Sequence, residues 1–233
     1  MRPETDPDLE WVGHLSGARA PAAERAVSEA QAEHRLFRHI AREHAQEGRD
    51  HYVEIDAPLE LYALVRLLRP RHVVEVGVSS GVSSAYLLQA LDQNGYGTLH
   101  SVDLPQKAAP GRAPRVSWSL PPGRSSGWAV PFPLRKRWDL RLGDKREVVP
   151  LLAGELDQIG LFVYDVPHDD VRCRPEFLAI DARLPRGGVA IVDHGADGDR
   201  CPTLRSWGRR RGAPTWGRQG TGLYGFRAGT AAT

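Results

Sequence analysis

The stretch from Arg71 to Ser84, RHVVEVGVSSGVSS, limits most strongly what this chain can fold into. Its first part is apolar and β-branched apart from Glu75, a composition typical of a short buried strand. The chain then passes through Gly77 and Gly81 into AYLLQAL, whose apolar spacing predicts a helix. A strand, a glycine turn and a helix in this order leave free backbone N–H groups at the helix N-terminus, and such a site favours an anionic group.

The spacing of the two glycines narrows the class of ligand. The segment reads E-x-G-x-x-x-G-x-S, whereas a dinucleotide fingerprint needs G-x-G-x-x-G and a P-loop needs G-x-x-x-x-G-K-[ST]. The turn is therefore wider and offers no close cradle for a pyrophosphate. A ligand with an amine and a carboxylate fits better, with Glu75 on the amine and with Ser83 and the turn amides on the carboxylate. The alternative is a strand, turn and helix that bind nothing.

Composition sets further limits on the chain. It has 233 residues, of which 41% are hydrophobic, enough for one large domain with a sizeable core. No run of eighteen apolar residues is present, so we expect no membrane span, and the acidic N-terminus lacks the apolar core of a secretory signal. The two cysteines, Cys173 and Cys201, lie far apart and indicate a reducing compartment, the cytoplasm, without a disulfide framework.

Charge is spread unevenly along the chain. The net charge is only +2, but the segment from Arg200 to Thr233 contains seven arginines and no acid. An arginine-rich end can meet nucleic acid or an acidic substrate. Lysine is rare throughout, with three lysines against 28 arginines, which points to a general preference of composition. We therefore expect no nucleic-acid partner.

Short apolar segments alternate with helical ones over most of the chain. We expect five such strands, at residues 71–76, 98–103, 138–142, 160–165 and 188–193. Strands that alternate with helices predict right-handed βαβ units and a parallel sheet. The runs within residues 215–226 are too close together for another crossover helix and predict a hairpin. The expected fold class is α/β and Rossmann-like: a doubly wound, mostly parallel seven-stranded sheet with helices on both faces and a C-terminal antiparallel hairpin.

Two helices are expected before the first strand and one long loop after the second. Residues 1–20 predict no regular structure, and a helix follows from Pro21 to Gly48, with its proline at the first helical position. A second helix is expected from Pro58 to Leu68. Residues 105–133 hold seven prolines and predict a lid-like loop that closes over a ligand.

Polar residues follow every predicted strand. They are Glu75 and Gly77, Asp103, Gly143 and Asp144, Asp165 with His168, and Asp193 with His194. Ligands of open α/β sheets bind outside the carboxyl ends of the strands, and an acid about 20 to 30 residues past the turn can hold ribose hydroxyls. A sheet that is only structural needs no acids at these ends. The pattern therefore predicts a single ligand pocket there.

The opening motif and the segment LFVYDVPHDD…FLAIDARLPRGGVAIVDH, from Leu161 to His194, resemble a known family. They are similar to class I methyltransferases that use S-adenosylmethionine (SAM), and among these to small-molecule O-methyltransferases of the cephalosporin hydroxylase-like and catechol O-methyltransferase-like type. The resemblance covers about residues 50–195. It implies an N-terminal helical extension over residues 1–56, a SAM-binding methyltransferase domain over residues 57–233, and a small hydroxyl-bearing, natural-product-like acceptor. A homodimer remains an open alternative.

The resemblance also implies which residues contact SAM. They are Glu75, Gly77, Ser79, Gly81, Ser83, Asp103, Gly143, Asp144 and Asp165. Within this set the glycine turn would hold the methionine part. Asp103 would take the ribose, and Asp144 the adenine amine.

Catechol-type relatives imply a divalent metal as well. Its ligands would be Asp165, Asp193 and His194, the last at a position where that branch has Asp or Asn. Magnesium prefers oxygen ligands, and an imidazole shifts the preference toward Fe, Zn, Mn, Co or Ni. His168 falls at the position of the general base, and histidine suits that role at neutral pH. The implied catalytic residues are therefore His168 and Asp165, with the metal lowering the pKa of the acceptor hydroxyl.

Three other interpretations stay open. The first is an N-, C- or nucleic-acid methyltransferase, although the amino methyltransferases carry [DN]-P-P-[YF] after the fourth strand, where this chain reads Asp165-Val166-Pro167-His168. The second is a protein of this fold that binds a ligand or partner without catalysis. The third is a metal-dependent oxygenase.

Overall fold

A seven-stranded sheet forms the centre of the protein. A computed structural model describes residues 6–47, 57–104, 120–166, 174–193 and 202–229. The strands are β1 (His72–Val76), β2 (Thr98–Asp103), β3 (Trp138–Leu142), β4 (Leu161–Tyr164), β5 (Val189–Asp193), β6 (Trp216–Gly217) and β7 (Leu223–Arg227). Their order across the sheet is β3-β2-β1-β4-β5-β7-β6. The first five run parallel, whereas β7 is antiparallel to β5 and to β6. The predicted fold class is confirmed.

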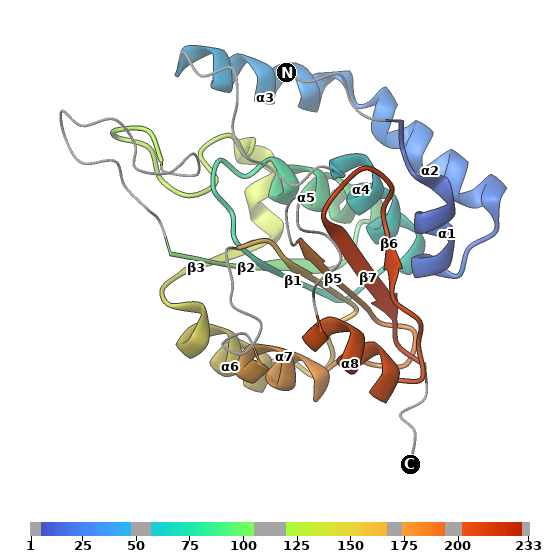
Figure 1. Ribbon diagram of the computed structural model, residues 1–233. Helices are drawn as coiled ribbons and strands as arrows, with labels where there is room; N and C mark the ends of the chain where they lie inside the picture. Colours follow the sequence, from blue (N-terminus) through green and yellow to red (C-terminus); the bar gives the residue numbers. More distant parts are fainter. Residues whose placement is uncertain (1–5, 48–56, 105–119, 167–173, 194–201, 230–233) are drawn as a thin grey trace.

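Helices cover both faces of this sheet (Figure 1); within the described ranges, five lie on one side and three on the other. The first group is α1 (Leu9–Ser16), α2 (Ala20–Ala32), α3 (His34–Gln46), α4 (Pro58–Leu68) and α5 (Val82–Asn94). The second group is α6 (Lys145–Glu155), α7 (Arg174–Asp181) and α8 (Pro202–Arg210). A short 3₁₀ helix, η1 (Phe132–Arg137), precedes β3.

Alternation along β1 explains why both faces are covered. Val73 belongs to the apolar cluster beneath α1 to α5, and Val74 and Val76 belong to the cluster beneath α6 to α8. Successive side chains of a strand point to opposite faces, so a strand that is apolar on both faces needs a helical layer on each. The first cluster also contains buried residues of α1, α2 and α3. The boundary at residue 56 stays a prediction, and residues 48–56 lie outside the described part of the chain.

The helices differ from the predictions at three places. Residues 9–16 form α1, where no regular structure was expected; the Asp8 carboxylate caps it by accepting from the Trp11 backbone N–H at 2.8 Å. The predicted helix from Pro21 to Gly48 is two helices, interrupted at Glu33, which has φ −76° and ψ 52°. Helix α8 was not predicted, and Trp207 anchors it in the core with 0% exposure.

A buried ion pair joins α4 to the loop between β6 and β7, the two strands of the C-terminal hairpin. Arg218 Nε donates to Glu60 Oε1 at 2.5 Å, and the two side chains are 1% and 2% exposed. Asp8 lies at the same junction, where its backbone N–H donates to Glu60 Oε1 at 3.1 Å. On the adjacent helix, Trp11 Nε1 donates to the Trp216 carbonyl at 3.1 Å. The Glu60–Arg218 and Trp11–Trp216 contacts connect residues 158 and 205 positions apart in sequence.

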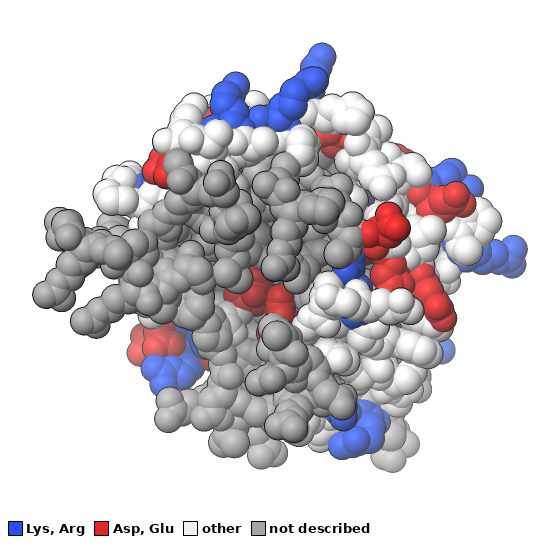
Figure 2. All heavy atoms as spheres, turned by 45° about the horizontal axis from the view of Figure 1, so that its top comes forward, with Lys and Arg blue, Asp and Glu red and all other residues white. Residues whose placement is uncertain are grey.

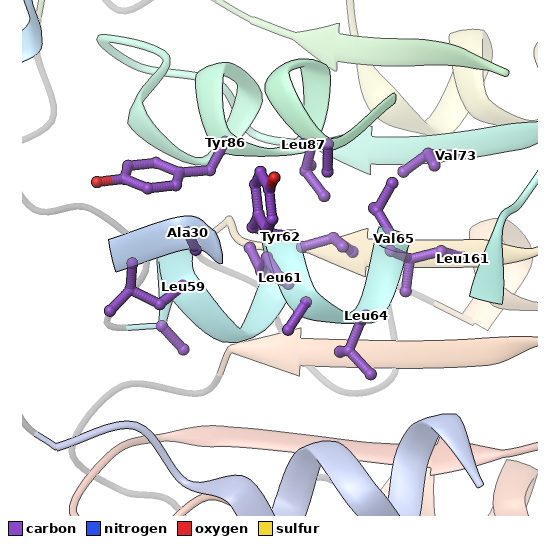
Figure 3. Packing of buried hydrophobic residues seen from close by; sticks show 14 of the residues in the cluster. Ala30, Leu59, Leu61, Tyr62, Leu64, Val65, Val73, Tyr86, Leu87 and Leu161 are labelled. Carbon is purple, nitrogen blue, oxygen red and sulfur yellow. The ribbon is translucent and has the colours of Figure 1, made fainter. Parts of the chain in front are cut away.

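Tyr62 is a buried phenol in the core between α4 and α5, and its burial predicts a pH dependence of stability. Its ring lies between these helices, near Leu87 (Figure 3). Burial raises the pKa of Tyr62 from 10.0 to about 12. The unfolded phenol therefore ionises first, and we expect the free energy of unfolding to fall as the pH rises from about 10 to about 12.

Urea unfolding at about pH 9 and about pH 11 measures this effect. The loss of stability between the two pH values should be smaller in Tyr62→Phe than in the wild type. Tyr96→Phe is the matched control, because Tyr96 is 45% exposed. An equal loss in Tyr62→Phe and in the wild type would contradict the assignment.

Candidate active site

The carboxyl ends of the parallel strands meet at one edge of the sheet, as predicted. Val76 is paired with Val102 and Tyr164, and Tyr164 with Val192. The residues that follow or end these strands, Gly77, Asp103, Asp165 and Asp193, are therefore neighbours in space. Two backbone hydrogen bonds fix the arrangement, from Gly77 N to Val102 O at 2.9 Å and from Asp165 N to Val76 O at 2.8 Å.

Gly77 is required by the close approach of β1 and β4. Its φ is +95°, a conformation that side chains disfavour. A Cβ atom placed on it would lie 1.9 Å from the carbonyl oxygen of Asp165. Any side chain at this position would push apart the two strand ends that bound the pocket.

The turn between β1 and α5 is held in an unusual backbone conformation. Gly81 caps α5 with φ +93°, and Ser79 has φ +50°. Residues other than glycine seldom adopt positive φ, and such strain tends to occur at ligand sites. The turn thus presents the N-terminus of α5 to the edge where the strands end.

Glu75 lies beneath the turn, fully buried. Ser83 donates to its Oε1 at 2.7 Å, and Ser84 and Ser101 donate to its Oε2 at 2.6 Å each. Burial raises the pKa of Glu75, and the three hydroxyls offset part of this rise. The carboxylate therefore fastens α5 to β1 and β2. Contacts of Glu75 and Ser83 with a ligand stay predictions.

Asp103 ends β2 at the predicted ribose position. Its Oδ1 accepts from the Val78 N–H at 3.3 Å, and its Oδ2 accepts from the Ser126 hydroxyl. Burial raises the pKa of the Asp103 carboxyl, and these donors oppose that rise. Ser126 was not among the predicted site residues, and the Ser125-Ser126-Gly127-Trp128 sequence in the predicted lid was the available signal for it.

The Asp144 carboxylate is already hydrogen-bonded within the first turn of α6. It caps α6 by accepting from the Arg146 N–H at 2.9 Å, and the Arg146 guanidinium bonds the same carboxylate at 2.7 Å. This pairing lowers the pKa of Asp144 to about 2. Gly143 lies beside Asp103, whose carbonyl accepts from the Gly143 N–H at 2.9 Å. The adenine contact of Asp144 stays a prediction.

The predicted metal ligands lie partly in the described region. Asp165 and Asp193 occupy adjoining strand ends, whereas His168 and His194 fall outside the described residues. Among the residues that the structure describes, no three His, Cys, Asp or Glu side chains form a group that could hold a metal ion. The metal site and the histidine base stay predictions.

Helix α3 reaches the glycine turn from outside the sheet. His44 Nε2 lies 3.0 Å from Ser80 Oγ, and the Arg124 guanidinium pairs with Glu47 at 2.5 Å and stacks over the Trp128 ring at 4.8 Å. Burial lowers the pKa of His44, and the neighbouring carboxylate of Glu43 opposes this shift. These contacts were not predicted, because they depend on long-range packing.

The predicted lid is only partly described. Residues 105–119 lie outside the described part, and the remainder, from Leu120, packs against the glycine turn. Figure 2 shows acidic atoms near the middle of the view, and further acidic and basic atoms interspersed toward its right side and rim. No helix in the described ranges is long and apolar enough to cross a bilayer.

A separate hollow of about 640 Å³ lies elsewhere on the molecule. Its lining includes His14, Arg186, Trp216 and Arg227. It adjoins Gly187, just before the amino end of β5, whereas the acids lie at the carboxyl ends. It is therefore not part of the site described above.

Comparison with known sequences decides the family. The profile of a family described as a methyltransferase domain matches residues 74–194, more than half of the chain. The chain belongs to this family. The match begins in β1 and extends past β5, so the methyltransferase domain contains the glycine turn and every strand-end acid described above.

Individual relatives agree with this methyltransferase assignment. A Mycobacteroides abscessus protein named as a presumed O-methyltransferase is 33% identical over 142 residues, which cover 61% of this chain and 56% of that protein. The alignment thus spans little more than half of the relative's length.

Two of the solved structures that share the fold are described as O-methyltransferases. They are the O-methyltransferase TomG from Streptomyces achromogenes with SAM (16% identity, 84% and 90% of the two chains covered, TM-score 0.56) and a Bacillus cereus O-methyltransferase with S-adenosylhomocysteine, SAH (16%, 82% and 90%, TM-score 0.52).

Proposed function

We propose that this methyltransferase-domain protein transfers a methyl group from SAM to a hydroxyl group of a small molecule. The observation that carries the proposal is the convergence of Gly77, Asp103, Asp165 and Asp193 at one sheet edge, inside the region that matches the family. The presumed O-methyltransferase activity of the Mycobacteroides relative supports the choice of oxygen as acceptor.

The residues at this edge fit the cofactor. The turn before α5 offers backbone N–H groups and a helix N-terminus to the carboxylate of the methionine part. Asp103 is partly exposed at the strand end and can accept hydrogen bonds from the ribose hydroxyls. When bound, SAM supplies an electrophilic methyl group, and its transfer to the acceptor oxygen leaves SAH.

The chain contributes binding, orientation and proton removal to this reaction. The turn and Asp103 would hold and orient the cofactor, so that its methyl group is presented to the acceptor oxygen. His168 is the proposed base that takes the proton of the acceptor hydroxyl. Residues 120–130 and α3 shield the turn from water on the outer side.

A divalent cation and a natural-product acceptor are finer parts of the proposal. The carboxylates of Asp165 and Asp193 on neighbouring strands provide oxygen ligands, and His194 would complete the set. A bound cation would lower the pKa of the acceptor hydroxyl. The TomG structure is described as that of an enzyme involved in tomaymycin synthesis, which supports testing natural products as acceptors.

Labelled methyl transfer from SAM tests the proposed function. We expect label to enter phenols, catechols or hydroxylated natural products, and not RNA. Prior treatment with EDTA should abolish transfer, and re-addition of one divalent metal should restore it. Transfer to RNA alone would overturn the proposed acceptor, whereas transfer that is unchanged by EDTA would overturn only the metal. Failure of the wild-type protein to bind SAH in calorimetry would overturn the function itself.

A further inference from the structure

Ser126 lies beside Asp103, at the predicted ribose position. Its hydroxyl donates to Asp103 Oδ2, and its side chain is buried with 5% exposure. The other carboxylate oxygen, Oδ1, accepts from the Val78 N–H at 3.3 Å. Asp103 is thus oriented from two sides. One side is the glycine turn, and the other is the segment of Ser126, which follows the turn by more than 40 residues in sequence.

Backbone hydrogen bonds attach the segment of Ser126 to the turn. The Gly127 N–H donates to the Ser79 carbonyl at 2.9 Å, and the Ala129 N–H donates to the Ser80 carbonyl at 2.9 Å. Both acceptors belong to the turn in which Ser79 has positive φ. These two bonds fasten the segment to the turn and give Ser126 a defined position beside Asp103.

Close packing on both sides of Gly127 fixes this position further. A Cβ atom on Gly81 would lie 2.8 Å from the Gly127 Cα, and a Cβ atom on Gly127 would lie 2.0 Å from the Trp138 ring. Trp138 is itself held, because its Nε1 donates to Ser101 Oγ at 2.8 Å. Gly127 is thus enclosed between the turn and Trp138, with no room for a side chain.

Helix α3 supports the same segment from outside. Arg124 bonds Glu47 at 2.5 Å and stacks on the Trp128 ring at 4.8 Å. The described end of the predicted lid is therefore a fixed wall of the site. A side chain on this wall, such as that of Ser126, can therefore contact a bound cofactor.

The hydrogen-bonding capacity of Ser126 suits a ribose. A serine hydroxyl has one donor and two acceptor lone pairs, and its donor is already directed at Asp103. A ribose diol brings two donors to a carboxylate that already accepts from Ser126 and from Val78. We propose that Ser126 is a nucleoside-binding residue: it orients Asp103 and accepts one of the two ribose hydroxyls. This inference rests on the proposed function.

Calorimetry with SAH and its 2′-deoxy and 3′-deoxy analogues tests the inference. Ser126→Ala should bind SAH about three- to tenfold more weakly than the wild type, the range expected for one hydrogen bond. Its affinity for the analogue that lacks the contacted hydroxyl should be reduced less, so that the preference for SAH over that analogue shrinks. Ser125→Ala is the matched control, because Ser125 is the exposed neighbour in the same segment.

Two further variants complete the series. Ser126→Cys, with a weaker hydrogen-bonding group of similar size, should give an intermediate loss. Asp103→Ala removes the carboxylate itself and sets the upper limit. Wild-type affinity for SAH in Ser126→Ala would overturn the inference, as would an equal loss for SAH and for both analogues, which indicates a structural effect. Binding of SAH by the wild type in these experiments leaves the proposed function intact.

Discussion

Gly77→Ala should unfold the site and abolish measurable SAH binding. The new Cβ atom would lie 1.9 Å from the Asp165 carbonyl oxygen, and the residue would have to keep φ near +95°. A left-handed backbone costs an L-residue about 1–2 kcal/mol, and overpacking costs about 1–3 kcal/mol. We therefore expect the free energy of unfolding to fall by about 3 kcal/mol or more, measured by urea unfolding, with calorimetry for SAH.

Gly95→Ala separates the cost of the left-handed backbone from the cost of overpacking. Gly95 also has positive φ, +66°, but a Cβ atom there would have no neighbour within 4 Å. Its substitution should cost only about 1–2 kcal/mol, the backbone part alone, and leave SAH affinity unchanged. If Gly77→Ala were no more damaging than Gly95→Ala, the contact between the ends of β1 and β4 would not limit the pocket.

Glu60→Ala should destabilise the protein by about 3–5 kcal/mol, the usual cost of removing one partner of a buried ion pair. The substitution deprives the Arg218 guanidinium of a carboxylate that lies 2.5 Å away, with both side chains almost fully buried. It also removes the acceptor of the Asp8 backbone N–H. Urea or thermal unfolding measures the change.

An exposed pair provides the control. Lys136 lies 2.8 Å from Asp92, but its side chain is 61% exposed. Lys136→Ala should cost no more than about 1 kcal/mol, because solvent screens such pairs. Similar losses in Glu60→Ala and Lys136→Ala would show that the buried pair contributes no more than a surface one.

The strands and the strand-end acids were predictable because their signals are local. Val73, Val74 and Val76 are apolar on both faces, which requires a strand between two helical layers. The acids Asp103, Asp165 and Asp193 follow from the rule that ligands bind at the carboxyl ends of parallel strands. Their convergence needed only that the strands run parallel, which the alternation of strands and helices implied.

The remaining site features depend on contacts that no local pattern encodes. Ser126 reaches Asp103 only because its segment is bonded to the turn across almost 50 residues. Helix α1 is short, and Trp11 finds its partner Trp216 at the far end of the chain. Asp144 is a different case. Its partner Arg146 lies only two residues later, so this competition for the carboxylate was predictable from the sequence.

The junction of Asp8, Glu60 and Arg218 also bears on the order in which these segments can fold during synthesis. The backbone N–H of Gln219 donates to Asp8 Oδ2 at 3.1 Å, across 211 positions. Helix α1 emerges from the ribosome well before its partners in the hairpin, which follow it by more than 200 positions in sequence. Until Trp216 and Arg218 leave the exit tunnel, Trp11 and the Glu60 carboxylate lack their contacts with these residues. During this period a chaperone could shield Trp11 and Glu60.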